Sequence, residues 1–94
     1  MFGRISFIGE DNVLVDLNEG VELKNNILSS HVVITDKEKM LLGEISELNQ
    51  GKVKIKLLGE FQNGKFFGGI IRKPLLDSVT RPVNEEEINI ILGG

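Results

Sequence analysis

The sequence has no cysteine, no tryptophan and no tyrosine, and its one histidine is His31. Without cysteine, the chain can form neither a disulfide, nor a thiolate metal site, nor a cysteine nucleophile. A lone histidine without a second cluster of ligand-type residues favours a strand-edge or interface position over a metal ligand or a general base. These absences exclude every cysteine-dependent site, and they leave a single histidine for any catalytic or metal-binding role.

Long apolar runs and phosphate-binding motifs are also missing. No segment approaches the roughly 18 apolar residues of a membrane span, and the first residues lack the basic and apolar segments of a signal peptide. Gly68-Gly69 has neither P-loop nor dinucleotide-binding spacing, so it predicts a bend in a strand. We therefore expect a soluble, cytoplasmic chain that contacts no membrane and has no catalytic residue, no cofactor and no metal of its own.

Alternation of apolar and polar residues is the dominant pattern that is present. The 94 residues suffice for one domain. Short alternating runs are interrupted by turn residues about every eight to twelve positions, which is typical of a small barrel or sandwich. Residues 19–30 lack the pattern and are predicted to form a long loop. The expected strands cover residues 4–7, 12–18, 31–35, 40–48, 52–61 and 65–71.

The C-terminal segment has a different character. Pro74 and Pro82 bracket a stretch unsuited to a central strand, because proline donates no ladder hydrogen bond. Asn84 and Glu87 then have the spacing of a capping box at the start of a short helix. The predicted fold class is all-β: a small six-stranded antiparallel barrel, closed or partly open, with a short C-terminal helix. The barrel is assigned to residues 1–73, and the proline-bracketed linker and helix to residues 74–94.

The tetrapeptide Leu-Leu-Gly-Glu occurs twice, at residues 41–44 and 57–60, in two strands expected to form a hairpin. A three-residue turn over positions 49–51 places the apolar residues of both strands on the same face of the sheet. Such a register is favoured because a shift by one residue would mix apolar and charged side chains on each face. A glycine opposite a leucine leaves room for strong strand curvature, so Gly43 and Gly59 are predicted to be structural. The resulting opposite pairs are Leu48 and Lys52, Ile45 and Ile55, Glu44 and Lys56, Gly43 and Leu57, Leu42 and Leu58, and Leu41 and Gly59.

The two glutamates of the repeat raise the question of paired carboxylate chemistry. Such chemistry needs environments that push the two pKa values apart. Glu44 and Glu60 are expected on a solvated, lysine-rich face, where that separation is missing, so we predict a surface role. Asn63-Gly64 is the strongest hairpin signal, and Gly64 is predicted to be structural because a type I′ turn needs positive φ. The candidate interface residues are Glu44, Lys52, Lys54, Lys56, Glu60 and Asn63.

A lysine-rich strand near phenylalanines is also typical of a nucleic-acid-binding barrel face. Phe61, Phe66 and Phe67 lie in phase with apolar neighbours, which favours a core role for them. The net charge is −3, which argues mildly against a dedicated phosphate-binding surface. A stand-alone nucleic-acid-binding small β-barrel remains the alternative interpretation.

Four stretches together resemble the N-terminal domain of HerA-type ATPases, called the HAS barrel. That barrel is itself similar to the N-terminal barrel of rotary ATP synthase subunits. The resemblance covers essentially the whole chain. The stretches are GRISFIGEDNVLVDL at residues 3–17, LLGEISEL at 41–48, VKIKLLGEFQNGKF at 53–66 and RKPLLDSVTRPVNEEEINIILG at 72–93.

The resemblance implies a non-catalytic assembly and partner-docking barrel of a HerA-like hexameric ATP-dependent DNA translocase or helicase, in DNA end processing and repair or in antiphage defence. The implied partners are sister subunits of a hexameric ring, a NurA-like nuclease or a defence effector, and DNA through the parent assembly. It also implies an excised domain of a longer chain, with ATP and magnesium expected only in an ATPase core after Gly94. The long loop, the lysine face and the Asn63-Gly64 tip are the expected contact regions.

Overall fold

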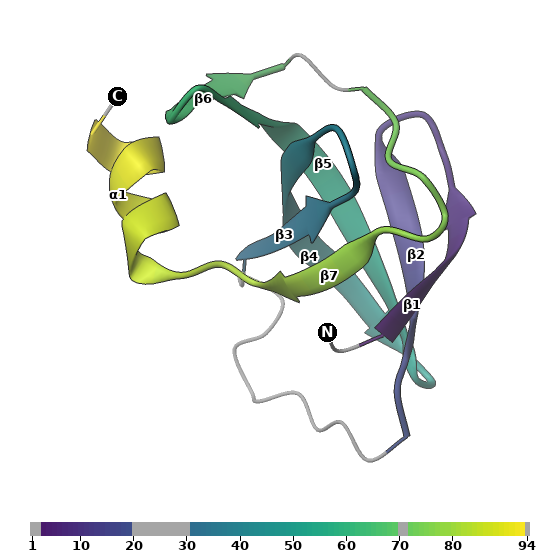
Figure 1. The fold of residues 1–94 in the computed structure, drawn as a ribbon. Helices are drawn as coiled ribbons and strands as arrows, with labels where there is room; N and C mark the ends of the chain where they lie inside the picture. Colours follow the sequence, from purple (N-terminus) through teal and green to yellow (C-terminus); the bar gives the residue numbers. More distant parts are fainter. Residues whose placement is uncertain (1–2, 20–30, 70–71, 94) are drawn as a thin grey trace.

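The structure is a computed structural model that describes residues 3–19, 31–69 and 72–93 (Figure 1). The predicted loop over residues 19–30 therefore lies, apart from Glu19, outside the described residues, as does the end of the predicted sixth strand at 70–71. The strands are β1 (Gly3–Ile8), β2 (Asn12–Leu17), β3 (His31–Thr35), β4 (Met40–Asn49), β5 (Lys52–Gln62), β6 (Lys65–Gly68) and β7 (Val79–Pro82), and the helix is α1 (Glu85–Gly93).

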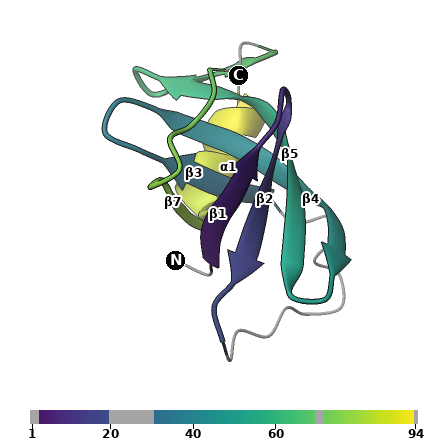
Figure 2. The ribbon, with the colours of Figure 1, turned by 90° about the vertical axis from the view of Figure 1, so that its right-hand side faces the viewer.

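The strands form one antiparallel sheet that curls into a partly open half-barrel. Six of them follow the order β1-β2-β5-β4-β3-β7, and β6 pairs with β5 off this path. The two end strands approach each other where the Thr80 hydroxyl donates to the Gly3 carbonyl oxygen at 3.5 Å. Figure 2 shows β1 and β7 at this seam, with α1 behind the sheet. The predicted class, a small and partly open antiparallel barrel with a short C-terminal helix, is confirmed.

The interior of the half-barrel is filled by aliphatic side chains. In β1, β2 and the first part of β5, alternate positions are buried, as the period of two in the sequence requires. β-Branched residues dominate this core, and they suit the pleated surface of a strongly curved sheet. The buried cluster consists of Ile5, Val13, Val15, Val32, Ile34, Leu41, Ile45, Val53, Ile55 and Leu57.

The strand β7 lies in the segment predicted to be a linker, and the sheet therefore continues beyond residue 73. It pairs with β3, so that Val32 lies opposite Pro82 and Ile34 opposite Thr80. Because β7 is an end strand of the sheet path, Pro82 interrupts no central ladder. No strand was expected in this proline-bracketed stretch of the sequence.

Of the two hairpin turns predicted on either side of β5, one is confirmed and the other is wrong. Asn63 and Gly64 have φ values of 52° and 76°, which confirms the type I′ turn between β5 and β6. The turn between β4 and β5 was predicted to have three residues, and this is wrong. Gln50 and Gly51 form a two-residue turn with φ values of 50° and 80°, because that geometry matches the twist of the flanking strands.

The register of β4 and β5 is consequently correct only in the middle of the hairpin. Three predicted pairs are observed: Glu44 with Lys56, Ile45 with Ile55, and Gly43 with Leu57. Ser46 on β4 and Leu58 on β5 are extra residues that shift the register on either side. The outer pairs are Leu48 with Val53, Leu42 with Gly59, and Leu41 with Glu60, so the predicted partners of Leu48, Leu42 and Gly59 are wrong.

These extra residues are β-bulges, and each reverses the alternation of the strand that carries it. A third lies at Ser6, between the pairs Ile5–Val15 and Phe7–Leu14. Ile5 is buried, whereas Phe7 is 54% exposed, although the two residues alternate in phase in the sequence. The bulges thus decide which side chains leave the core.

The predicted capping box of α1 is confirmed. The Glu87 amide donates to Asn84 Oδ1 at 2.8 Å, and the Asn84 amide donates to Glu87 Oε1 at 3.0 Å. The Arg81 guanidinium also binds the Glu87 carboxylate, and this hydrogen bond lowers the pKa of Glu87 against the opposing effect of burial. The start of the helix is therefore tied to the end of β7.

Candidate interaction surface

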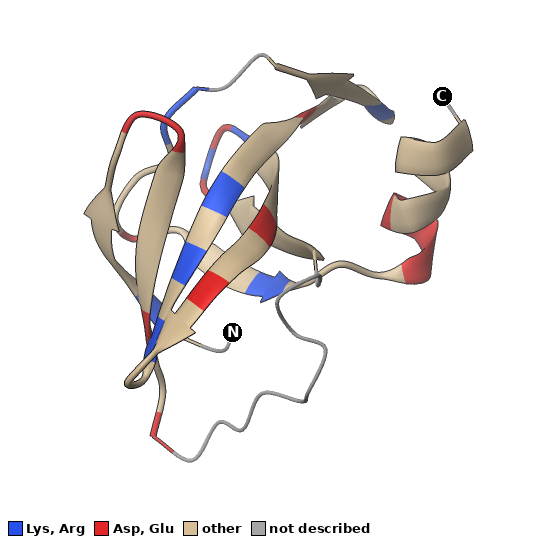
Figure 3. Cartoon of the chain, turned by 180° about the vertical axis from the view of Figure 1, so that it is seen from behind, with Lys and Arg blue, Asp and Glu red and all other residues tan. Residues whose placement is uncertain are grey.

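The outer side of β2, β5 and β4 carries rows of opposite charge, which we call the outer charged face. Lys52 lies opposite Asp16 of β2, and Lys54 lies opposite Glu47 of β4. Figure 3 shows the lysines along β5 beside the acidic residues of β4. The face consists of Asp16, Glu44, Glu47, Lys52, Lys54 and Lys56, so four predicted interface residues, Glu44 and the three lysines, lie together on it.

The contacts on this face are those of solvated ion pairs. The Lys52 Nζ and Asp16 Oδ1 atoms are 3.3 Å apart, with both side chains about half exposed. His31 Nε2 lies 3.8 Å from Glu44 Oε2. His31 is on β3, between β4 and β7, so it is an interior strand position of the sheet path and borders the face. Exposed pairs of this kind stabilise a fold little, by at most about 1 kcal/mol each.

Glu60 does not lie on the lysine face, and this prediction is wrong. The bulge at Leu58 reverses the alternation of β5, so Glu60 pairs with Leu41 on the inner side of the sheet. Glu60 is 1% exposed. Strict alternation from Lys56 would have placed it outside, and the bulge removes it from the candidate interface.

The buried carboxylate of Glu60 is fully engaged. Arg72 Nε donates to Glu60 Oε1 at 3.0 Å, and Arg72 Nη2 binds Oε2. Gln62 Nε2 donates to Oε2 at 3.0 Å. The hydrogen bond from Arg72 lowers the pKa of Glu60, outweighing the effect of burial, and that from Gln62 lowers it further. Glu60 is therefore a structural anion, held by a bidentate guanidinium pair.

A second anchored carboxylate lies on the turn between β3 and β4. Lys39 Nζ is 2.7 Å from Asp36 Oδ2, and both side chains are buried. The Glu38 and Lys39 amides donate to Asp36 Oδ1, and the Leu75 amide donates to Oδ2 at 3.4 Å. Burial alone acts to raise the pKa of Asp36, but the hydrogen bonds from Lys39 and from the backbone together lower it to about 2.

The two carboxylates hold one segment, residues 72–78, which we call the strap. Arg72 at its start binds Glu60, and the Leu75 amide reaches Asp36. Within the strap, the Ser78 amide and hydroxyl both donate to the Leu75 carbonyl oxygen, at 3.1 and 2.6 Å. The strap is thus fixed at its start and at its middle, and none of these three contacts was expected from the sequence.

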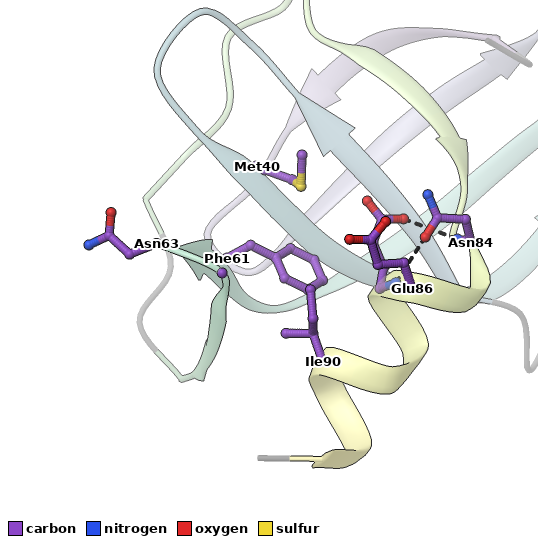
Figure 4. Close-up of a pocket in the computed structure, with 8 residues that line it drawn as sticks. Met40, Phe61, Asn63, Asn84, Glu86 and Ile90 are labelled. Carbon is purple, nitrogen blue, oxygen red and sulfur yellow. Dashed lines mark hydrogen bonds between the residues drawn. The ribbon is translucent and has the colours of Figure 1, made fainter.

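Asn63, the sixth predicted interface residue, lies apart from the outer charged face. It lines a groove of about 360 Å³ between the β5–β6 hairpin and α1 (Figure 4). Phe61 and Ile90 point toward each other across it, and Met40 lies beside them. The remaining lining residues are Gly64, Asn84, Glu86 and Glu87.

The three predicted structural glycines lie at close-approach or turn positions, although the close neighbours of Gly43 and Gly59 are not the leucines expected. A Cβ atom on Gly43 would lie 2.4 Å from Ile55 Cγ2, and one on Gly59 would lie 2.4 Å from the Phe67 carbonyl oxygen. Gly59 therefore makes room for β6 and not for Leu41. Gly64 has open space around it and is required for its positive φ.

The phenylalanines were expected in the core, and the structure places them at its margin. Phe61 and Phe66 are half-buried, with ring centroids 5.4 Å apart, and Phe67 is exposed. They belong to the end of β5 and to β6, which lies off the barrel path. The aliphatic residues alone fill the interior.

Among residues 3–19, 31–69 and 72–93, no group of three or more histidine, aspartate or glutamate side chains is arranged to hold a metal ion. Within the same part of the chain, no helix is long and apolar enough to cross a membrane.

No model of a known protein family matches the chain, and no curated protein sequence matches it.

Proposed function

We propose that this chain is the assembly and partner-docking barrel of a HerA-like hexameric ATP-dependent DNA translocase. Three of the motifs that carry the resemblance lie in structured parts of the half-barrel. Gly43-Glu44-Ile45 forms the correctly predicted pairs at the centre of the β4–β5 hairpin, and Leu58-Gly59-Glu60 forms the bulge and the buried anion. Pro74 and Pro82 lie in the strap and in β7. A barrel of this kind suits a docking role.

The observation that carries the proposal is the charge pattern of the outer charged face. Each of its three lysines lies opposite an acidic residue: Lys52 opposite Asp16, Lys54 opposite Glu47, and Lys56 opposite Glu44. A surface that neutralises DNA phosphates presents unopposed positive charge. Alternating charges instead give a protein partner a register to match, because charge complementarity fixes orientation and rejects wrong partners.

The experiment that tests this proposal uses the whole reading frame that encodes these residues. We expect it to continue into a P-loop with the pattern Gly-x-x-x-x-Gly-Lys-Ser/Thr, and its product to hydrolyse ATP and to form a ring. In that protein, K52E, K54E and K56E together are expected to leave ATP hydrolysis intact and to abolish binding of the nuclease or effector encoded beside it. A reading frame with no P-loop would contradict the proposal.

The nucleic-acid-binding alternative has a direct test of its own. The 94-residue chain is titrated with a labelled single-stranded oligonucleotide at low salt, and fluorescence anisotropy is measured. We expect no saturable binding, because the acidic partners neutralise the lysine row. Binding that weakens steeply with salt and disappears in the triple glutamate variant would establish the alternative instead.

A further inference from the structure

The strap presents an apolar and basic protrusion. Leu75 is 48% exposed and Leu76 is 60% exposed, and Lys73 beside them is exposed as well. Pro74 between them is buried and, with Arg72 bound to Glu60, fixes the backbone from which they project. Two adjacent exposed leucines on a rigid segment lose little conformational entropy when a partner covers them.

The groove beside α1 is complementary to the strap, because it is apolar and acidic. Its floor is apolar, from Met40, Phe61 and Ile90, and its rim carries Glu86 (Figure 4). The neighbouring Glu87 carboxylate is already occupied by Arg81 and by the helix cap. Glu86 is therefore the carboxylate at the rim that can receive a cation from outside. A volume of about 360 Å³ has room for a leucine side chain.

The strap and the groove lie on opposite sides of the molecule. In Figure 1 the strap lies on the side of β1 and β2, and α1 lies on the far side next to β6. Figure 2 agrees, with the strap in front and α1 behind the sheet. The strap, anchored at Glu60 and Asp36, therefore cannot fill the groove of its own chain.

We propose that the strap of one copy of this chain inserts into the α1 groove of a second copy, with Leu76 on the apolar floor and Lys73 beside Glu86. This inference rests on the proposed function, since it names the contact through which sister barrels meet. The contact joins two different surfaces, so it is head-to-tail: the first copy keeps its groove free and the second keeps its strap free, and further copies can add at either end. Its area is small, and we expect a Kd of about 1 mM for the isolated barrels.

The test is sedimentation equilibrium of the 94-residue chain at concentrations up to about 1 mM, the range of the expected Kd. A head-to-tail contact makes the average mass rise without a plateau at the dimer, whereas a symmetric contact stops at two copies. We expect L76S to weaken association about tenfold, because it removes the apolar group from the floor. The matched control is L92S, which changes an exposed leucine in α1 that does not line the groove, and this variant is expected to have no effect.

Charge reversal gives the sharper result. K73E and E86K are each expected to weaken association about fivefold, whereas E85K, in the same helical turn but outside the groove, is not. An equimolar mixture of K73E and E86K is expected to associate like the unaltered chain. In the mixture, the strap of a K73E chain meets the groove of an E86K chain, so the two charges are exchanged but still opposite. The strap of an E86K chain meets the groove of a K73E chain, and both of these surfaces are unaltered.

Two outcomes would overturn the inference. One is a chain that stays monomeric at about 1 mM, or associates with a mass that ends at the dimer. The other is association that K73E and E86K leave unchanged and that K52E on the outer charged face abolishes. Either result would leave the proposed function standing, because that depends on the P-loop and on partner docking in the whole protein. All of these substitutions are at exposed positions, and circular dichroism verifies that each variant is folded.

Discussion

The two copies of Leu-Leu-Gly-Glu lie in adjacent strands of one hairpin, yet their glutamates have opposite environments. The Glu44 side chain is 40% exposed on the outer charged face, whereas that of Glu60 is 1% exposed and bound by Arg72. The glycines differ as well. Gly43 lies against a side-chain methyl group of Ile55, whereas Gly59 lies against the backbone of β6. Identical tetrapeptides thus serve an exposed face in one strand and a buried ion pair in the other.

The difference shows that a bulge and a distant segment can outweigh local sequence. Leu58 is the extra residue that turns Glu60 inward, and Arg72 arrives from twelve positions further along the chain. A carboxylate is buried at acceptable free energy only when a cation and hydrogen bonds compensate it. The strap supplies both for Glu60. Glu44 needs neither because water solvates it.

The largest expected contrast is between the two glycines. We expect Gly59→Ala to lower the free energy of unfolding by about 3 kcal/mol, because a Cβ atom would collide with a backbone oxygen of β6. Gly43→Ala is expected to lower it by less, about 2 kcal/mol, because the closest atom there is a side-chain methyl group of the buried Ile55 and not a backbone atom. Urea unfolding followed by circular dichroism measures both, since the chain has no tryptophan or tyrosine. Equal losses would show that β6 is not held against Gly59.

The next contrast is between the two carboxylates. Glu60→Gln is expected to destabilise the chain by about 2 kcal/mol, because it replaces charge-assisted hydrogen bonds to a buried group with weaker ones. Glu44→Gln is expected to change stability by less than about 0.5 kcal/mol. The same urea measurement compares them. A loss at Glu44 as large as that at Glu60 would mean that the outer charged face is part of the folding core.

The elements that the sequence predicted well are those with local causes. β3, β4 and β5 follow from alternation and from the turn residues between them. The Asn63-Gly64 turn and the Asn84–Glu87 capping box each depend on two residues whose conformation is decided within four positions. Nothing distant in the chain competes with these signals, and the structure agrees with them.

The elements that were missed depend on residues far apart. Ser46 and Leu58 have no composition that marks them as bulges, so pairing by alternation misplaced Glu60 and the partner of Gly59. Exposure of Phe7 follows from the bulge at Ser6 and was hidden for the same reason. The partnership of Arg72 with Glu60 becomes visible only once the strap is placed. Of the candidate site, the outer charged face was therefore predictable and the anchoring of the strap was not.

A smaller contrast appears in the pH dependence. The pKa of Glu60 is lowered from its ordinary value of 4.5, and that of Asp36 is lowered to about 2 from 3.8. For a carboxyl group whose folded-state pKa is depressed, the stabilisation is present above the unfolded-state pKa and is lost as the pH falls through the folded-state pKa. We expect the free energy of unfolding to be flat above about pH 5 and to fall between about pH 4.5 and pH 2. Glu60→Gln and Asp36→Asn should each make this fall shallower.

The control for the acid transition is Glu44→Gln, measured by the same urea titrations at each pH. This variant is expected to retain the full slope below about pH 4.5, since the Glu44 side chain is 40% exposed and takes no part in the buried contacts of Glu60 and Asp36. A slope that Glu44→Gln reduces and Glu60→Gln leaves unchanged would reverse the assignment of the acid-sensitive carboxylate.

The smallest expected effect concerns the cross-strand pair of Glu44 and Lys56, which is tested by a double-mutant cycle of Glu44→Gln and Lys56→Met. The two residues are directly opposite in the ladder, but both are accessible to water, which screens their attraction. We expect a coupling energy of about 0.3 kcal/mol in low salt, and less in high salt. The matched cycle of Glu60→Gln and Arg72→Met is expected to show a larger coupling that salt reduces less, because one partner is shielded from solvent. Equal coupling and equal salt sensitivity in the two cycles would show that burial by the Leu58 bulge gives the second glutamate no electrostatic distinction from the first.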